Sequence, residues 1–242
     1  MKQDKLFSIE KETVADFSFD EAVADVFPDM LRRSIPGYET IIAMLGVLAR
    51  CYAQDNTRVY DLGCSLGAAT LSVHRQTREL SLQHICVDNS SAMIRRCESK
   101  LKRHMPAASI ELICGDIQNI QIENASVVLL NFTLQFLPQT TRLALLKNIY
   151  KGLRSGGVLI LSEKLMCDDD KVNQLFIDWH HEFKRANGYS DLEISQKRAA
   201  IENVLIPDTL NTHKKRLSDA GFSQTHQWFQ ALNFSSLIAL KT

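Results

Sequence analysis

Hydrophobic and polar positions change their period near residue 58. Before it, apolar residues recur at helical spacing in two runs, and Pro36-Gly37 predicts a turn between them. The two runs consist of Val23, Val26, Phe27, Met30 and Leu31, and then of Ile41, Ile42, Leu45 and Leu48. We therefore expect residues 1–56 to form a helical cap.

From residue 58 onward, short β-rich runs alternate with helical runs, which is the pattern of a parallel sheet with crossover helices. Strands are predicted at residues 58–62, 84–87, 109–114, 127–131 and 158–162. Helices are predicted at about 67–77, 91–103 and 139–153, with Ser155-Gly156-Gly157 ending the last one. These elements predict a nucleotide-binding core over residues 57–163. In a core of this kind, the ligand site lies at the carboxyl ends of the strands.

The pattern changes again after the fifth strand. Residues 170–219 have helical character, so we expect a helical insert over residues 164–221. The runs 224–230 and 234–240 are too close for a crossover helix and predict a terminal antiparallel hairpin within residues 222–242. The expected fold is a single α/β domain over residues 1–242, Rossmann-like, with a mostly parallel seven-stranded sheet.

Charge and hydropathy weigh against several functional classes. The 242 residues include 28 basic and 28 acidic side chains, and this balance weighs against direct nucleic acid binding, which favours a basic excess. The longest apolar run, residues 127–130, is too short to span a membrane, and the first residues show no apolar signal region. We expect a cytoplasmic protein without a membrane interaction.

A turn of small residues follows the first predicted strand. Gly63 permits a tight bend and a close approach to a ligand, and Gly67 brings the next helix near the strand. The second strand ends at Asp88, whose carboxylate can accept both hydroxyl protons of a ribose. The alternative is that Asp88, Asn89 or Ser90 only caps the following helix. Both roles are compatible, with Ser90 as the cap and Asp88 as the ligand.

The third and fourth strands also end in polar residues. Asp116 and Ile117 could flank an adenine, and Asn131 offers an amide near the reacting end of a ligand. Each one alone is equally explained as a turn residue. Their common position at one sheet edge favours a nucleotide site.

Taken together, these motifs resemble the class I S-adenosylmethionine-dependent methyltransferases. The motifs are Asp61-x-Gly63-x-Ser65-x-Gly67, the acidic Asp88, Gly115-Asp116-Ile117, the segment 153–157 and the terminal hairpin. The superfamily usually has glycine where this chain has Ser65. A dehydrogenase is disfavoured because the G-x-G-x-x-G spacing is absent.

A closer resemblance extends over nearly the whole chain. Residues 26–30, 34–38, 61–72, 131–137 and 183–190 are similar to the carboxy-S-adenosyl-L-methionine synthase family. The resemblance implies that S-adenosyl-L-methionine and prephenate are converted to carboxy-S-adenosyl-L-methionine and phenylpyruvate. In the reaction proposed for that family, prephenate loses carbon dioxide, which the deprotonated sulfonium methyl group then captures.

The resemblance also implies partners and site residues. The product would serve a tRNA uridine carboxymethyltransferase that forms 5-oxyacetyl uridine at the wobble position, and the enzyme would be a homodimer. The family's nucleotide contacts correspond to Tyr38, Gly63, Cys64, Ser65, Asp88, Asn89, Asp116, Ile117 and Asn131. Its carboxylate-binding arginine, which we take as catalytic, corresponds to Arg198.

The residues around Arg198 give an independent argument. Ser190 and Glu193 form a capping box that starts a helix, on which Ile194, Arg198, Ile201 and Leu205 share one face. A guanidinium on an apolar face needs an anion. The alternatives are a pair with Glu202 or exposure to solvent. Lys197 is explained by a surface pair with Glu193.

Other polar residues carry less information. His180-His181-Glu182 lacks metal-binding spacing and favours a surface helix, so no metal is expected. Glu163 and Lys164 end the fifth strand without an assignable role. Two alternative functions stay open: an S-adenosylmethionine-dependent methyltransferase acting on a small molecule or a tRNA uridine, and a non-catalytic adenosyl-binding partner of a tRNA-modifying enzyme.

Overall fold

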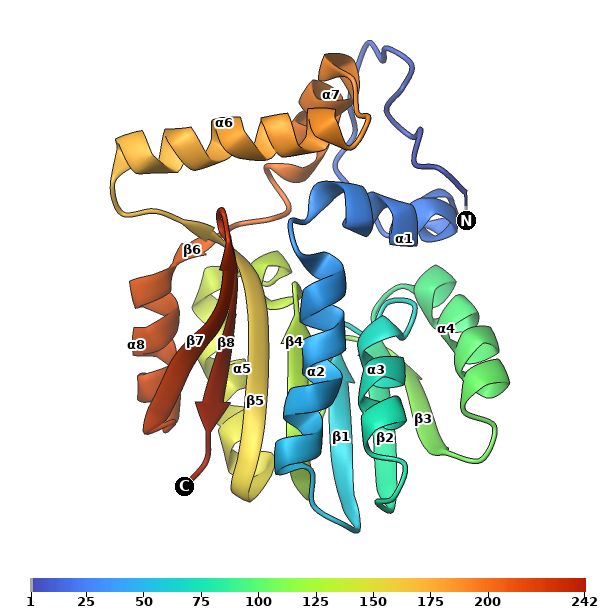
Figure 1. The fold of residues 1–242 in the computed structure, drawn as a ribbon, viewed down its shortest axis with the longest axis vertical. Coiled ribbons are helices and arrows are strands. Elements are labelled where there is room, and N and C mark those ends of the chain that lie inside the picture. Colours follow the sequence, from blue (N-terminus) through green and yellow to red (C-terminus); the bar gives the residue numbers. More distant parts are fainter. Residues whose placement is uncertain (1) are drawn as a thin grey trace.

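The computed structural model describes residues 2–242, and its centre is one sheet with the strand order β3-β2-β1-β4-β5-β8-β7 (Figure 1). Strands β1 to β5 are parallel, whereas β8 runs antiparallel to both β5 and β7. Their bounds are Thr57–Leu62, Leu82–Asp88, Ser109–Cys114, Ala125–Asn131, Leu153–Met166, Gln224–Ala231 for β7 and Phe234–Leu240 for β8. The two-residue β6, Asp208–Thr209, pairs with the end of β5. The predicted fold class is confirmed.

Helices cover both faces of the sheet because its central strands are apolar on both sides. One face is packed by α2 (Tyr38–Tyr52), α3 (Ala68–Gln76) and α4 (Ser91–His104), and the other by α5 (Gln139–Gly152) and α8 (Leu210–Ala220) (Figure 1). Ile41 and Leu45 of α2 pack against Val127 and Val158 in the buried core. Leu146 of α5 and Leu217 of α8 are fully buried on the opposite face.

A third layer lies across the carboxyl ends of the parallel strands, at the top of Figure 1. It consists of α1 (Glu21–Ser34), α6 (Asp170–Ala186) and α7 (Asp191–Ile201), together with the chain before α1. Asp20, Asp169 and Ser190 cap the amino ends of these three helices through their side chains. No helix within residues 2–242 has the length and apolarity needed to cross a membrane.

The predicted cap and the predicted insert each contribute one helix to the layers that pack on the sheet, and the rest of their helices to the layer over the strand ends. Helix α2, expected within the cap 1–56, belongs to the layer that packs on the sheet, because its apolar face meets the strands. Helix α8, expected within the insert 164–221, packs against α5 and is the crossover helix before β7. The layer over the strand ends is therefore formed by α1, α6, α7 and the amino-terminal segment.

Two predicted boundaries were wrong. Helix α5 ends at Gly152, where a side chain would meet the backbone oxygen of Ile122 at 2.1 Å, and not at Ser155-Gly156-Gly157. That segment lies inside β5, which begins at Leu153. Strand β5 also continues beyond the predicted end at residue 162, because its pairing with β8 extends to Lys164 opposite Phe234.

Candidate active site

A cavity of about 920 Å³ lies between the carboxyl ends of the strands and the layer of α1, α6 and α7. Its volume is in the upper range of small-molecule sites. All nine residues expected to contact the nucleotide line this cavity: Tyr38, Gly63, Cys64, Ser65, Asp88, Asn89, Asp116, Ile117 and Asn131. The structure thus brings together residues from β1, β2, β3, β4 and α2 at one place.

The turn after β1 has a left-handed backbone that explains its small residues. Gly63 has φ of +84°, and a Cβ there would lie 2.3 Å from Oγ1 of Thr133. Ser65 also has a positive φ, +49°, which accounts for the glycine that the methyltransferase superfamily usually has at this point. The turn places the backbone N–H of Ser65 within 2.9 Å of Asp88, to which it donates.

Asp88 is fixed by two backbone hydrogen bonds. Its Oδ2 accepts from the N–H of Ser65 and its Oδ1 from the N–H of Ser90, both at 2.9 Å. Burial raises the pKa of Asp88, whereas these two donors oppose the rise. Ser90 caps α4 by accepting from Met93, so that part of the prediction is confirmed. The Asp88 carboxylate has further acceptor capacity for the two hydroxyls of a ribose.

The tips of β3 and β4 supply contrasting surfaces. Asp116 is exposed and caps a short 3-10 turn, Ile117–Asn119, by accepting from Gln118, whereas Ile117 is 5% exposed. Asn131, the last residue of β4, has a buried Oδ1 without a hydrogen-bond partner among residues 2–242. A buried amide oxygen is normally paired, so this atom fits a donor group of a bound molecule.

Below the cavity, Asp61 anchors the turn to α3. Its Oδ2 accepts from the N–H and the Oγ1 of Thr70 at 3.1 and 2.6 Å. Burial raises the pKa of Asp61 to about 6, against the opposing effect of these hydrogen bonds. Burial also raises the pKa of the Tyr38 phenol, with a smaller contribution from the Asp61 charge. Within residues 2–242, no group of three His, Cys, Asp or Glu side chains could hold a metal ion.

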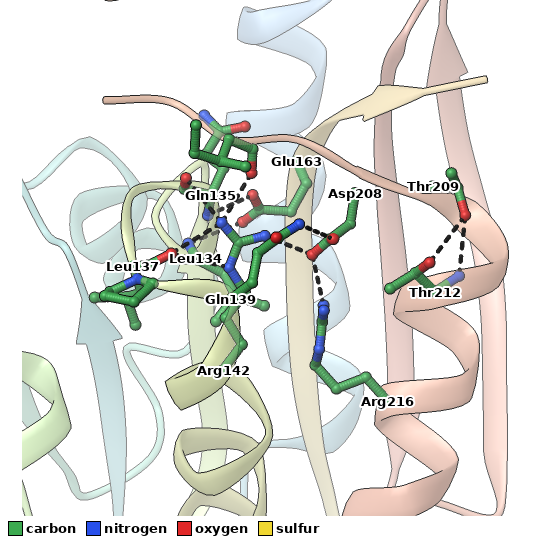
Figure 2. Close-up of polar contacts among 12 residues, drawn as sticks. Leu134, Gln135, Leu137, Gln139, Arg142, Glu163, Asp208, Thr209, Thr212 and Arg216 are labelled. Carbon is green, nitrogen blue, oxygen red and sulfur yellow. Dashed lines mark hydrogen bonds and ion pairs between the residues drawn. The ribbon is translucent and has the colours of Figure 1, made fainter. Parts of the chain in front are cut away.

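Glu163 holds the loop that follows β4, a role that the sequence did not indicate. Its Oε1 accepts from the N–H of Leu134 at 3.0 Å and its Oε2 from the N–H of Gln135 at 2.9 Å (Figure 2). Burial raises the pKa of Glu163 to about 8, while Arg142 and the two N–H donors act in the opposite direction. The same loop lines the cavity through Phe132, Thr133 and Gln135.

Arg142 fixes the loop from the other side. This fully buried guanidinium donates to Oδ2 of Asp208 at 2.5 Å and to the backbone oxygens of Gln135, Leu137 and Ile206 at 2.8 to 3.1 Å (Figure 2). Asp208 also accepts from Arg216 of α8 at 2.8 Å. Because Asp208 and Ile206 are 66 and 64 positions from Arg142 in the sequence, no spacing rule could have found these two contacts.

Known proteins match this sequence both in the nucleotide-binding core and over nearly the whole chain. Residues 59–157 match the family described as "Methyltransferase domain". Carboxy-S-adenosyl-L-methionine synthase from Aliivibrio fischeri is 55% identical over 238 residues, which cover 98% of both chains. The proteins of that name from Haemophilus ducreyi and Vibrio cholerae are 53% and 54% identical, covering 100% and 99% of this chain and 99% and 97% of theirs. The chain belongs to the carboxy-S-adenosyl-L-methionine synthase family.

Solved structures place the same fold among methyltransferases. An O-methyltransferase family protein from Burkholderia thailandensis has a TM-score of 0.68 at 17% identity, covering 93% of this chain and 61% of the other. Human N-acetylserotonin methyltransferase has a TM-score of 0.62 at 15% identity, covering 91% and 55%. At this identity the likeness concerns the fold, which the synthase family shares with much longer chains.

The arginine carried over from the synthase family is not where the sequence argument placed it. Arg198 is exposed and lies outside the cavity lining, so its predicted position on a buried apolar stripe was wrong. The buried face of α7 includes Glu193, Gln196 and Lys197. It also includes Ile194 and Ala200, and its polar members have partners: Gln196 donates to the backbone oxygens of Phe7 and Ile9, both at 2.9 Å.

The neighbours of Arg198 also differ from expectation. The capping box of Ser190 and Glu193 is confirmed, with Glu193 accepting from the N–H of Ser190 at 2.8 Å. Lys197, expected in a surface pair with Glu193, is 7% exposed and contacts Ser34 and Asp4 instead. His180, expected on a surface helix, is 5% exposed and its Nε2 lies 2.7 Å from the oxygen of Ser34. Both Lys197 and His180 line the cavity.

Proposed function

We propose that this protein converts S-adenosyl-L-methionine and prephenate to carboxy-S-adenosyl-L-methionine and phenylpyruvate. The observation that carries the proposal is the identity of 55% to a synthase of that product over 98% of both chains. The product would serve a separate tRNA uridine carboxymethyltransferase in the cytoplasm, where it forms 5-oxyacetyl uridine at the wobble position. The balanced charge of the chain accords with a small-molecule substrate.

The nucleoside would bind at the tips of β1 to β4. In this assignment Asp88 accepts the ribose hydroxyls, Ile117 packs on the adenine ring, and Asp116 accepts from the exocyclic amine. The unpaired Oδ1 of Asn131 would receive a donor near the methionine end. Gly63 lines the cavity without a side chain, so its backbone would lie beside the bound molecule.

For this reaction the protein must position the two substrates, stabilise the charges that develop and exclude water. The layer of α1, α6 and α7 covers the strand tips and would keep water from a reactive carbanion and from free carbon dioxide. We propose that Arg198 binds the new carboxylate. Support comes from its position near Lys164, which lines the cavity: burial lowers the pKa of Lys164, and the charge of Arg198 lowers it further.

We further propose a homodimer. Val172, Leu175 and Trp179 of α6 are 41%, 43% and 46% exposed and are spaced to share one helix face. Exposed apolar side chains gathered in this way favour a protein interface. Sedimentation velocity should give a dimer for the wild-type protein and a shift toward monomer for Trp179→Ser; a monomeric wild-type protein would refute the proposal.

Product analysis tests the reaction. The protein is incubated with S-adenosyl-L-methionine and prephenate without tRNA, and the products are separated and identified by mass spectrometry. We expect carboxy-S-adenosyl-L-methionine and phenylpyruvate in equal amounts, without stoichiometric S-adenosylhomocysteine. Methyl transfer to a tRNA uridine or a small molecule, without the carboxylated product, would establish a methyltransferase instead. Retention of the nucleoside with no turnover would indicate a binding partner only.

A further inference from the structure

One wall of the cavity carries ammonium groups from three different elements. Lys164 comes from the end of β5, Lys184 from α6 and Lys197 from α7, and all three line the cavity. Lys184 and Lys197 are 9% and 7% exposed, and Lys164 is half-buried. Lysine is almost never buried to this degree unless it is paired.

Of these three lysines, only Lys197 has a polar partner for its Nζ within residues 2–242. Nζ of Lys197 lies 3.5 Å from Oδ2 of Asp4 and donates to Oγ of Ser34 at 3.1 Å. Neither Lys164 nor Lys184 has an ion pair or a hydrogen bond from its Nζ within residues 2–242. Two ammonium groups on one wall of the cavity therefore lack an anion.

The carboxylates of the cavity lie on its other side. Asp61, Asp88 and Asp116 stand at the tips of β1, β2 and β3, whereas Lys164 belongs to β5. Two further lining carboxylates, Asp20 and Glu21, lie at the start of α1, where Glu21 pairs with Arg95 and Arg96 of α4. In the strand order β2-β1-β4-β5, neighbouring strands are about 4.8 Å apart, so β2 and β5 are separated by about 14 Å. None of the lining carboxylates forms an ion pair with Lys164 or Lys184 in the described part of the chain, residues 2–242.

The lowered pKa values on this wall of the cavity favour binding of an anion there. Burial, and then the charges of Lys197, Lys164 and Arg198, lower the pKa of Lys184 to about 7. Burial and Arg198 also lower the pKa of Lys164. His180 on the same wall supplies no compensating group, because burial and the nearby lysines lower its pKa to about 2 and keep it neutral. An anion bound here would favour the protonated form of both lysines and so oppose these decreases in pKa.

Apolar rings stand beside the two lysines. Phe132 and Phe234 are 9% and 5% exposed, line the same cavity and meet edge to face with centroids 6.1 Å apart. The ring of His180 packs against Phe234 at 4.9 Å. This combination of two cations and aromatic surface fits a cyclic acid with two carboxylates.

We propose that Lys164 and Lys184 bind the two carboxylates of the acid co-substrate, with its ring against Phe132 and Phe234. This assignment rests on the proposed function, in which the co-substrate is the dianion prephenate. The negatively charged nucleoside side would then hold the sulfonium cation, and the positively charged wall would hold the dianion facing it. Opposite charges thus set the mutual orientation of the two substrates before reaction.

The test separates acid binding from turnover. The protein is saturated with S-adenosylhomocysteine, which has no methyl group to react, and prephenate binding is measured by titration calorimetry. The variants are Lys164→Met, Lys184→Met and the double variant, and Lys214→Met of α8 is the control because Lys214 is exposed and does not line the cavity. Affinity for S-adenosyl-L-methionine and circular dichroism are measured for each variant.

We expect each single variant to weaken prephenate binding at least about tenfold, and the double variant about a hundredfold, with nucleoside affinity within about twofold. The thermal midpoint of Lys184→Met should not fall, because methionine removes an unpaired buried cation. In contrast, a lysine with a purely structural role would lower the midpoint and leave prephenate affinity unchanged.

The failures of the two proposals are distinguishable. Wild-type prephenate affinity in both methionine variants, or no prephenate binding by the wild-type protein, would overturn the lysine assignment. A wild-type protein that binds prephenate through these lysines but releases no carboxylated product would support the assignment and overturn the proposed reaction. Product formation with unchanged KM for prephenate in the double variant would overturn only the lysine assignment.

Discussion

Replacing Glu163 with glutamine tests whether the buried carboxylate holds the loop after β4. Both oxygens of Glu163 accept a backbone N–H, from Leu134 and Gln135, and the side chain is 2% exposed. A glutamine has one oxygen acceptor and one NH₂ donor. In either orientation of the amide, one backbone N–H therefore faces a donor and loses its partner.

The magnitude follows from this one lost hydrogen bond. A buried N–H without an acceptor costs about 1–3 kcal/mol. For a chain of this size, a loss of 1 kcal/mol lowers Tm by roughly 2–4 °C, so the expected decrease is about 2–12 °C. Because the loop carries Phe132 and Thr133 into the cavity, its displacement should also reduce kcat/KM by about tenfold to a hundredfold.

The assay combines thermal unfolding, nucleoside binding and product formation. Glu202→Gln is the matched control, since Glu202 is exposed and its side chain has no ion pair or hydrogen bond within residues 2–242. We expect the control to behave as the wild type in all three measurements. A Glu163→Gln protein with the Tm and kcat/KM of the wild type would refute the positioning role of the carboxylate.

Four further predictions concern the cavity. Asp88→Asn should weaken S-adenosyl-L-methionine binding about tenfold or more in calorimetry, because the amide keeps one acceptor oxygen and loses the charge-assisted ribose contacts; unchanged affinity would place the nucleoside elsewhere. Gly63→Ala should abolish nucleoside binding and lower Tm, because the new Cβ would lie 2.3 Å from a side-chain oxygen in a left-handed turn; normal binding would show that the turn can shift. Arg198→Ala should leave nucleoside affinity within about twofold and sharply reduce carboxylation, and Arg198→Lys should restore only part of it; equal loss of both functions would contradict a role limited to the carboxylate. With a pKa of about 7, Lys184 is protonated below neutral pH, so KM for prephenate should rise as pH increases above 7, and this rise should be absent in Lys184→Met.

Sequence pattern was sufficient for the sheet because a parallel sheet has a local signature. Each central strand is a short apolar run, and the residue after it lies at a common edge. This reasoning located Asp88, Asp116 and Asn131 at one cavity before their contacts were known. The terminal hairpin followed from the short connection between its two strands, whereas the order of the strands came only from the structure.

The layer over the strand tips could not be predicted in the same way. Its helix α7 buries Glu193, Gln196 and Lys197 beside Ile194 and Ala200. The rule that apolar residues mark the buried side was therefore correct for Ile194 but wrong for Arg198, which is exposed while Lys197 is buried. The partners of Lys197 and Gln196 are in the first residues of the chain, more than 180 positions away for Gln196 and Phe7. A helical period contains no information about contacts at such separation.

The distribution of charged side chains in the cavity indicates which part of the fold would bind the second substrate. The tips of β1 to β3 carry the carboxylates that suit a nucleoside, and they belong to the matched methyltransferase domain of residues 59–157. Lys164, Lys184 and Lys197 all lie outside that range, on the extended end of β5 and on α6 and α7. If Lys164 and Lys184 bind the acid, its selection depends on residues outside the matched domain, at the end of β5 and on α6. Changes at Lys164 should therefore alter acid preference, whereas changes at Asp88 should alter nucleoside affinity. The two effects should be additive, because β5 and β2 are separated by about 14 Å.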